Sequence, residues 1–320
     1  MTEYAVRLQD VKKTFGSHVA VRDLNLEIAS GSIYGFIGPN GSGKTTTIRM
    51  ILRIFFPDRG RVEVLGQAAG NCADERVGYL PEERGIYRRM KVRELLRYYA
   101  RLKGFRDCDA EITRWLQRLG AEDWGNRRID SLSKGMSQKV QFIAAVVSQP
   151  QLLILDEPFS GLDPVNLELL QSAIQEIRSR GTTIIFSTHE MDSAERLCER
   201  VFMIHQGRKV LDGSVQQIQQ NYPADEIRVR CQEASTLPVT IHGVTSRQQR
   251  GAYTHLKLQQ GSFAEDVLGQ LAAETRLEHF ELIRPSLHNI FIRIAGEDAV
   301  GEDAVGEADQ SAPSVQTDQT

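Results

Sequence analysis

No apolar run in the sequence is long enough to form a helix across a membrane. The stretch FIAAVV at 142–147 is among the longest, and it falls far short of the ~18 residues that such a helix needs. The opening MTEYAVRLQD alternates polar and apolar side chains and lacks the basic and then apolar layout of a secretory signal. We therefore expect the chain to stay in the cytoplasm and not to cross a bilayer itself.

Cysteine is also scarce. The few cysteines are scattered along the chain, without the paired spacing of a zinc site or a redox dithiol. Reduced structural thiols are the simplest interpretation of this distribution. They are Cys72, Cys108, Cys198 and Cys231.

Neither sign of charge dominates, since the formal net charge is −3. From residue 297 to the end there are seven acids and no Lys or Arg, which leaves a mild excess of bases before it. A dedicated nucleic-acid-binding protein typically carries a strongly basic patch, so we expect no nucleic-acid partner. The low hydrophobicity of 297–320 predicts a disordered acidic tail, and an acidic docking tail is the alternative.

The order of periodic segments predicts a mixed α/β domain over residues 1–220. YAVRLQDVKKTF and VAVRDLNLEI alternate apolar and polar side chains, as half-buried antiparallel strands do. GSIYGFIG is continuously apolar, as a buried strand is, and a helical pattern follows at 44–55. QLLILDE and TTIIFSTH flank the helical VNLELLQSAIQEIRSRG, an order that implies a parallel sheet with covering helices. Helical stripes from Val92 to about Leu119 predict a helical insert at about 91–135.

Residues 221–296 predict a second, small α+β domain. DEIRVRC and YTHLKLQ alternate as strands do. Ser262 and Glu265 form a capping-box pattern ahead of the helical FAEDVLGQLAAE. A final segment, SLHNIFIRI, places Leu287 and Ile290 on one face of a helix.

The glycine-rich stretch after the apolar strand carries the first chemical signal. GPNGSGKT fits the pattern G-x-x-x-x-G-K-[ST], whose glycines let backbone N–H groups surround phosphate oxygens at a helix start. Lys44 would neutralise the β- and γ-phosphates, and the Thr45 hydroxyl would bind Mg²⁺. A chance glycine-rich turn is the alternative, which the flanking strand and helix disfavour. The predicted nucleotide-binding residues here are Gly38, Pro39, Asn40, Gly41, Ser42, Gly43, Lys44, Thr45 and Thr46.

An acidic pair, Asp156 and Glu157, ends the apolar strand LLILD. Ligands of α/β sheets usually lie where the chain leaves such a strand. Hydrolysis of a nucleotide needs one carboxylate to hold Mg²⁺ and another to orient or deprotonate water. We assign Asp156 to the metal and Glu157 to the water.

The order of these motifs resembles that of the ATP-binding subunits of ABC transporters, and the likeness covers roughly residues 1–220. Where that family usually has LSGGQ, this chain has LSKGM. The resemblance implies that Ser133 and Gly135 contact the γ-phosphate of an ATP held by an opposite subunit. Lys134 and Met136 depart from the common form of the motif.

The resemblance implies four more site residues. Asp163 ends SGLD, the loop that couples the two sites of the dimer in this family. His189 stands at the place of the family's switch histidine, which touches the γ-phosphate. Phe15 would stack on adenine, with core packing as the alternative. Glu82 stands where the family usually has Gln, and its carboxylate would still reach Mg²⁺ or water.

The stretch RRMKVRELLRYYARLKGFR in the predicted insert is rich in Arg and Lys. Arg93, Arg97 and Arg101 lie four apart, on one face of a helix. A solvated surface is the simplest interpretation of such a face. The resemblance implies another, because the helical insert receives the membrane partner in this family.

As a whole, the resemblance implies a P-loop NTPase of the ABC type, with an N-terminal antiparallel β subdomain and a helical insert. Its cofactors would be ATP and Mg²⁺, and its partners an integral membrane permease and a second ATP-binding subunit, in a homodimer. The end of the chain is similar to that of bacterial exporter subunits, so the transporter would export ions or small molecules. The chain itself would lie at the inner face of the cell membrane, held there by the permease. The alternative is a soluble ABC ATPase that acts on ribosomes or nucleic acid; such proteins usually carry two cassettes or a long coiled-coil insert.

Overall fold

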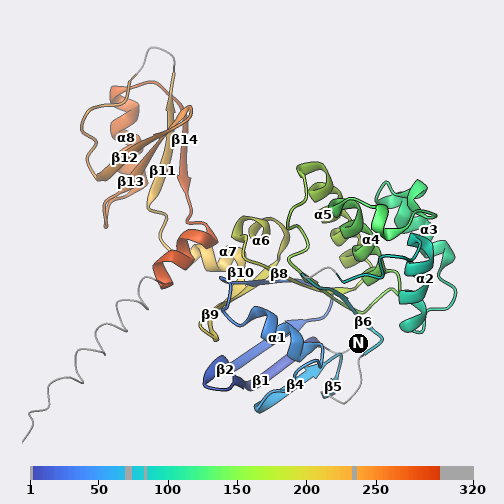
Figure 1. The fold of residues 1–320 in the computed structure, drawn as a ribbon. Coiled ribbons are helices and arrows are strands. Elements are labelled where there is room, and N and C mark those ends of the chain that lie inside the picture. The colour runs from blue at the N-terminus through green and yellow to red at the C-terminus, as the bar shows by residue number, and fades with distance from the viewer. Residues whose placement is uncertain (1–2, 69–73, 83–84, 233–235, 296–320) are drawn as a thin grey trace, which may run out of the picture. The chain divides into compact units, whose positions relative to one another are not determined.

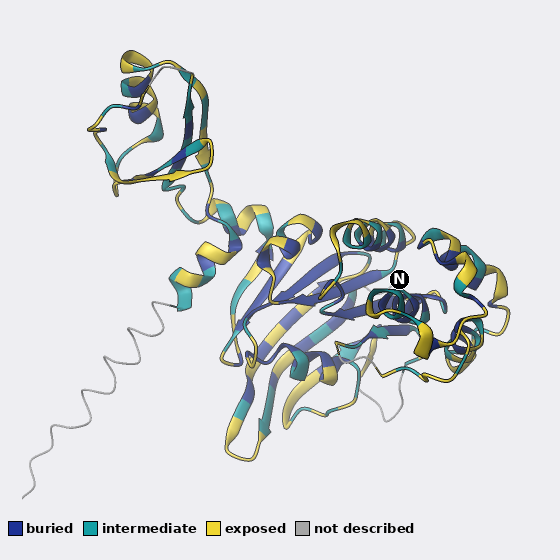
Figure 2. Cartoon of the chain, turned by 45° about the horizontal axis from the view of Figure 1, so that its top comes forward, coloured by how far each residue is buried: buried dark blue, intermediate teal, exposed yellow. Residues whose placement is uncertain are grey.

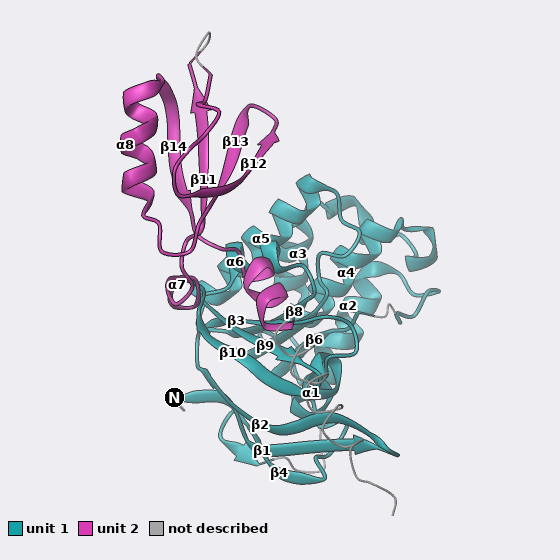
Figure 3. Cartoon of the chain, turned by 90° about the vertical axis from the view of Figure 1, so that its left-hand side faces the viewer, with its two compact units in different colours: residues 1–215 teal, residues 216–320 magenta. Residues whose placement is uncertain are grey.

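The chain forms two compact units in a computed structural model, residues 1–215 and 216–320 (Figure 3). Cys72 and the predicted acidic tail lie outside the described residues. Among the described residues, Cys108, Cys198 and Cys231 are free thiols. The structure describes residues 3–68, 74–82, 85–232 and 236–295.

An antiparallel sheet begins the first unit (Figure 1). The predicted alternation is observed along β2, where Leu24, Leu26 and Ile28 are buried and the residues between them are exposed. One face of this sheet therefore packs into the core and the other faces solvent. Its strands lie in the order β2 (His18–Ala29), β1 (Tyr4–Phe15), β4 (Arg59–Val64) and β5 (Gln67–Ala68).

The second sheet is parallel except at one edge, where β10 runs antiparallel to β9. Every residue of β3, β7 and β8 is buried, which explains their mainly apolar sequences. The predicted parallel α/β core is confirmed. The order is β10 (Arg208–Ser214), β9 (Arg200–His205), β3 (Ile33–Ile37), β8 (Thr183–Thr188), β7 (Leu152–Asp156) and β6 (Val77–Leu80).

Helices cover both faces of the parallel sheet (Figure 1). α1 (Lys44–Ile51) lies between the two sheets (Figure 1), where Ile48 joins Leu8, Phe36 and Phe202 in one buried cluster. The strands of the parallel sheet are mainly buried (Figure 2). Other helices cover the opposite face or extend from it. They are α2 (Val92–Leu102), α3 (Asp109–Arg118), α4 (Lys134–Val146), α5 (Pro164–Ser179) and α6 (Met191–Leu197), with short 3₁₀ turns at Glu122–Trp124 and Ile129–Ser131.

One predicted helical limit in this unit differs from the structure. The pattern at 44–55 predicts a longer helix, but α1 ends at Ile51. Arg53 adopts a left-handed conformation, with φ of 60°, and the Ile54 N–H turns back to the Arg49 carbonyl, 2.8 Å away. A left-handed residue cannot continue a right-handed helix, so the helix stops although its apolar pattern goes on. The helical stripes predicted between Val92 and Leu119 are confirmed, and they belong to two helices, α2 and α3.

The second unit is a four-stranded antiparallel sheet with one helix packed on it. Val267 and Leu271 of α8 (Ala264–Glu274) are buried against Ile227 and Leu256 of the sheet. The final predicted helical segment is helical over 287–295, with Leu287 and Ile290 buried. The strand order is β12 (Val244–Arg250), β13 (Tyr253–Leu258), β11 (Glu226–Cys231) and β14 (Leu277–Ile283), and α7 (Val215–Gln220) precedes them.

The predicted capping box at Ser262 and Glu265 is wrong. The residue that caps α8 is Phe263, and no side chain accepts a hydrogen bond from the first turn. The Ser262 hydroxyl lies instead against Gly243, where an added Cβ would stand 2.9 Å from it. Ser262 therefore contacts Gly243, which is distant in the sequence, and does not cap α8.

A network of ion pairs joins α3 to α5. Glu176 of α5 pairs with Arg114 at 2.8 Å and Arg118 at 2.9 Å, both on α3, and with Arg180 at 2.6 Å. Burial disfavours ionisation of Glu176, but its hydrogen bond with Arg118 and the nearby guanidinium charges outweigh burial and lower its pKa. One carboxylate therefore holds three guanidinium groups together between the predicted insert and the core.

Glu176→Gln is expected to lower the free energy of unfolding by about 1–2 kcal/mol, because it removes one of two shared anions. Arg114 and Arg180 would keep Glu111 as a partner, whereas Arg118 would lose its carboxylate. Since the native pKa of Glu176 is lowered, this contribution is complete above the ordinary carboxyl pKa of 4.5 and is lost as the pH falls further. Urea unfolding of both proteins at neutral and acidic pH measures it. Glu168→Gln, an exposed position on the same helix, is the control, and an equal loss in both variants would contradict the network's role.

Candidate nucleotide-binding site

The glycine-rich loop joins β3 to α1, and the backbone requires glycine at two of its positions. At Gly43, with φ of 111°, an added Cβ would stand 2.6 Å from the Ala20 carbonyl oxygen. At Gly38, with φ of 149°, it would stand 2.3 Å from the Ile204 carbonyl oxygen. Carbonyl oxygens of β2 and β9 therefore lie so close to the loop that a side chain at Gly43 or Gly38 would collide with them.

Lys44 is the buried cation of this loop, with 7% of its surface exposed. Its ammonium donates to the carbonyl oxygens of Gly38 at 2.6 Å and Pro39 at 2.9 Å. Burial lowers the pKa of Lys44, and the charges of Glu157, Asp156 and Glu82 oppose that shift. A cation next to three carboxylates can bind an anion that carries a metal ion, because the metal offsets the carboxylate charges.

Asp156 ends β7 and is 3% exposed. Burial raises the pKa of Asp156, while a hydrogen bond from the Ser187 hydroxyl acts in the opposite direction. On the neighbouring β6, burial and then the charge of Asp156 raise the pKa of Tyr79 to about 12. Asp156 is therefore a fixed, weakly solvated carboxylate at the carboxyl edge of the sheet.

Glu157 follows Asp156 in a left-handed conformation, with φ of 49°, which non-glycine residues seldom adopt. Its Oε1 accepts a hydrogen bond from the His189 N–H at 2.9 Å and lies 2.7 Å from His189 Nδ1. Its Oε2 accepts from the Thr188 hydroxyl at 3.2 Å. Both carboxylate oxygens are thus engaged with the end of β8.

A cavity of about 220 Å³ lies among these groups. It brings together most of the residues that the sequence predicts: Phe15 at the end of β1, the loop and first turn of α1, and the three carboxylates. Phe15 is 44% exposed, and its ring packs edge-on against Phe55, with the centroids 5.3 Å apart. The predicted residues that line the cavity are Phe15, Asn40, Gly41, Gly43, Lys44, Thr45, Thr46, Glu82, Asp156 and Glu157.

Other predicted residues lie outside this cavity. Ser133 is exposed at the start of α4, where its hydroxyl accepts a hydrogen bond from Met136 N at 3.2 Å, and Gly135 follows in the first turn. Asp163 is exposed at the start of α5, and its hydrogen bonds from Asn166 lower its pKa. His189 contacts Glu157 without lining the cavity. Gly38, Pro39 and Ser42 belong to the loop but do not line it either.

The structure adds residues that the sequence analysis did not single out. His18 and Ala20 of β2 line the cavity, although they lie far from the loop in the sequence. Their position depends on the packing of the antiparallel sheet against α1, for which the local sequence carries no signal. Ser187 and Thr188 hydrogen-bond to the acidic pair and directly precede His189 in TTIIFSTH. Their place at the end of a buried strand was the signal that could have identified them.

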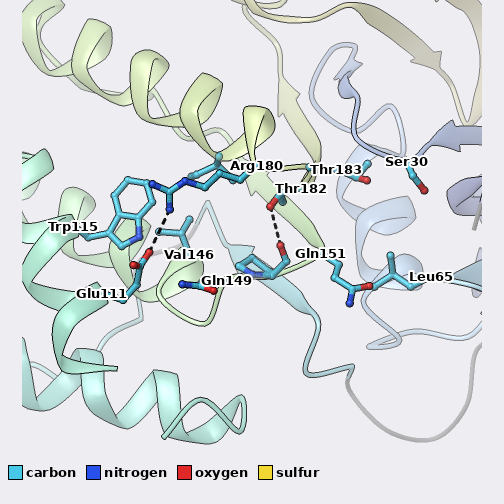
Figure 4. Close-up of a pocket in the computed structure, with 13 residues that line it drawn as sticks. Ser30, Leu65, Glu111, Trp115, Val146, Gln149, Gln151, Arg180, Thr182 and Thr183 are labelled. Carbon is cyan, nitrogen blue, oxygen red and sulfur yellow. Dashed lines mark hydrogen bonds and ion pairs between the residues drawn. The ribbon is translucent and has the colours of Figure 1, made fainter. Parts of the chain in front are cut away.

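A larger cavity, of about 450 Å³, contains none of the predicted residues (Figure 4). It lies where β7 and β8 begin, beside Gln151 and Thr183, and α3 contributes Glu111 and Trp115 to its wall. The acidic pair marks the other end of the same strands. Ligands of open α/β sheets bind at the carboxyl ends, so the smaller cavity is the candidate nucleotide site.

Comparison with known proteins agrees with this geometry. Residues 21–160 match the family model described as ABC transporter, and residues 213–295 match the model described as ATP-binding protein DrrA1-3-like, C-terminal domain. The ABC transporter ATP-binding protein YhaQ of Bacillus subtilis (strain 168) is 38% identical over 90% of this chain and 98% of its own length. The chain belongs to the ABC transporter ATP-binding proteins.

Other members of the ABC family give the same assignment. Nod factor export ATP-binding protein I of Rhizobium sp. (strain N33) is 33% identical over 93% of this chain and 99% of its own length. A solved structure of an ATP-binding subunit of an ABC transporter is 29% identical, with a TM-score of 0.63 over 68% of this chain and 92% of that one. The fold and family predicted from the motifs are confirmed, and the chain is the ATP-binding subunit of a membrane transporter. These relatives give no support to the alternative of a soluble ATPase acting on ribosomes or nucleic acid.

No helix among the described residues is long and apolar enough to span a bilayer. Nor do the described residues contain a group of three or more His, Cys, Asp or Glu side chains that could hold a metal ion by themselves.

Proposed function

We propose that this chain hydrolyses Mg-ATP and couples hydrolysis to export of an ion or small molecule through a permease. The observation that carries the proposal is the convergence of Lys44, Asp156 and Glu157 on one cavity beside the glycine-rich loop. The relatives named as Nod factor export proteins support the direction of transport. We assign hydrolysis to residues 1–220 and propose that 221–296 form a separate supporting domain.

The residues present fit a magnesium nucleotide. The Thr45 hydroxyl and the Asp156 carboxylate offer the hard oxygen ligands that Mg²⁺ prefers, and Glu82 offers a third from the same wall. Bound Mg²⁺ would neutralise charge on the β- and γ-phosphates. Lys44 would exchange its carbonyl partners for phosphate oxygens, and the loop N–H groups would surround the phosphates. Phe15 lines the cavity and is 44% exposed, so we propose that its ring stacks on adenine.

Glu157 is the group that we assign to the attacking water. Glu157 lines the cavity, and its Oε1 contacts His189 Nδ1. We propose that His189 positions Glu157 and then contacts the γ-phosphate, which would free a carboxylate oxygen for the water. In this mechanism the contact between His189 and Glu157 is present before ATP binds and breaks when His189 moves to the γ-phosphate.

A second subunit would complete the site. Ser133, Gly135 and Asp163 lie outside the cavity of their own chain, and Ser133 and Asp163 are exposed. We propose a homodimer in which these residues of one copy meet the γ-phosphate bound by the other. The start of α4 then offers a hydroxyl and backbone N–H groups to an anion.

A groove of about 250 Å³ between β6, α2 and α4 is our proposed docking site for the permease. Its lining is mainly apolar, with Tyr79, Leu80, Pro81, Ile86 and Tyr99 among its residues. A helical segment of a partner could bury apolar side chains there. This contact would hold the chain at the inner face of the membrane.

Retention of labelled ATP on the purified chain tests the proposal. Lys44→Met is expected to weaken Mg-ATP retention by about tenfold or more, because it removes the only buried ammonium of the loop and one charge-assisted contact to the phosphates. Filter binding measures the effect, and Lys209→Met, on the surface strand β10, is the control. Retention by Lys44→Met equal to that of the wild type would contradict the assignment of the cavity.

A further inference from the structure

The segment around α2 is unusually basic for this chain. Residues 88–106 contain eight Lys or Arg and a single acid, Glu94, although the whole chain has a net charge of −3. We propose that this segment binds the anionic headgroups of the bilayer that holds the permease, an inference that rests on the proposed function. The name α2 basic surface is used below for Tyr87, Arg88, Arg89, Lys91, Tyr98, Arg101 and Leu102.

Backbone pairing concentrates the charge at one end of α2. The Asp130 N–H donates to the Arg88 carbonyl at 2.9 Å, and Lys91 forms a bridge with Arg128. The exposed Arg127 and Arg128 therefore lie beside the start of the helix and add to its cations.

Among the residues that the structure describes, few of these cations are paired with a carboxylate. Arg97 pairs with Asp109 at 2.7 Å, and Arg128 pairs with Asp130 at 2.7 Å. Among the described residues, no carboxylate lies within ion-pair distance of Arg88, Arg89 or Arg101. The α2 basic surface thus carries a positive charge available for an external anion.

Exposed apolar and aromatic side chains are interleaved with these cations. Tyr87 is 55% exposed, Tyr98 38% and Leu102 57%. The two tyrosine rings pack edge-to-face, with centroids 5.5 Å apart. Tyrosine is favoured at the boundary of a bilayer because its ring is apolar and its hydroxyl polar. Cations next to tyrosines are the composition expected for contact with headgroups.

The neighbourhood of the surface favours lipid over a protein partner. Tyr98 packs against Tyr99, which lines the proposed permease groove, with ring centroids 5.6 Å apart. A permease seated in that groove would bring the bilayer to this side of the chain. The cytoplasmic loops of membrane proteins are themselves rich in Lys and Arg, so they would repel the α2 basic surface. Anionic lipids of the inner leaflet attract such a surface.

Flotation with lipid vesicles tests the proposal on the purified full chain. Vesicles containing about one third phosphatidylglycerol are expected to retain the chain, and vesicles of phosphatidylcholine alone are not. Retention should fall as the salt rises from about 0.1 M to about 0.5 M, since screening shortens the reach of the charges. Equal retention on both vesicle types, or none on anionic vesicles at low salt, would overturn the proposal.

A charge-removing variant assigns the binding to this surface. The triple variant Arg88→Gln, Arg89→Gln and Arg101→Gln is expected to lower partitioning onto anionic vesicles by on the order of 10- to 100-fold. The matched control removes three exposed arginines elsewhere: Arg22→Gln, Arg59→Gln and Arg208→Gln. An equal fall in both variants would assign the effect to net charge and overturn the proposal.

Further measurements show whether each variant is folded and whether the partner of the α2 basic surface is lipid or protein. ATP retention and the melting temperature of each variant show whether it is folded, and the salt dependence of the wild type remains a test if a variant is not. Binding to a soluble acidic polypeptide without binding to vesicles would assign the α2 basic surface to a protein and overturn the lipid assignment. ATP retention without vesicle binding would remove this proposal and leave the proposed function standing.

Discussion

Glu157→Gln is expected to lower steady-state ATP hydrolysis by on the order of 10³-fold and to leave Mg-ATP retention close to that of the wild type. The amide keeps the shape of the side chain, so the contacts with Thr188 and His189 can be largely preserved. It cannot accept a proton from water at neutral pH, and it removes one negative charge next to the phosphates. Phosphate release under saturating ATP measures the loss.

The matched control is Glu190→Gln, an exposed carboxylate that follows His189 and accepts a hydrogen bond from Ser193. This variant changes charge by the same amount near the site and is expected to keep nearly full activity. Hydrolysis at the wild-type rate by Glu157→Gln would refute the assignment of the water-orienting group. A parallel loss of ATP retention would show that Glu157 acts in binding.

Ser133→Arg is expected to abolish ATP-dependent dimerisation while leaving nucleotide retention by the monomer largely intact. Ser133 is exposed and lies outside its own chain's cavity, so the substitution should not disturb that cavity. In the proposed dimer, the long side chain would occupy the space of the partner's γ-phosphate. Light scattering in the presence of Mg-ATP measures the dimer, on a Glu157→Gln background so that the nucleotide persists.

Ser133→Ala separates steric blockage from local destabilisation. The Ser133 hydroxyl accepts a hydrogen bond from Met136 N, and loss of such a cap typically costs about 1 kcal/mol in both variants. Only Ser133→Arg also places a long side chain in the proposed dimer interface. A dimer of unchanged stability in Ser133→Arg would count against the shared site, whereas loss of the dimer in both variants would locate the effect in the start of α4.

The loop and acidic pair could be predicted because each chemical role lies in a short, contiguous stretch. Lys44 follows its glycines directly, and Asp156 ends a strand whose burial is evident from its apolar run. The sequence could not show that Gly43 lies against Ala20, because that contact joins β2 to the loop across the core. His18 and Ala20 were missed for the same reason.

The incorrect predictions also have physical causes. The helical pattern at 44–55 contains apolar residues past the true end of α1, but the left-handed Arg53 ends the helix, and periodicity does not detect a single backbone angle. Ser262 has the right spacing for a cap, yet its hydroxyl lies against Gly243. In both places the arrangement of the whole chain decides between local alternatives that the sequence leaves close in energy.

The hydrogen bonds from Thr188 and His189 to Glu157 bear on how the chain behaves before it joins a permease. Both oxygens of this carboxylate already have partners in a solitary chain. If His189 must move to the γ-phosphate before Glu157 can act, as proposed, a copy outside the transport complex would hydrolyse ATP slowly and consume little of the cell's energy supply.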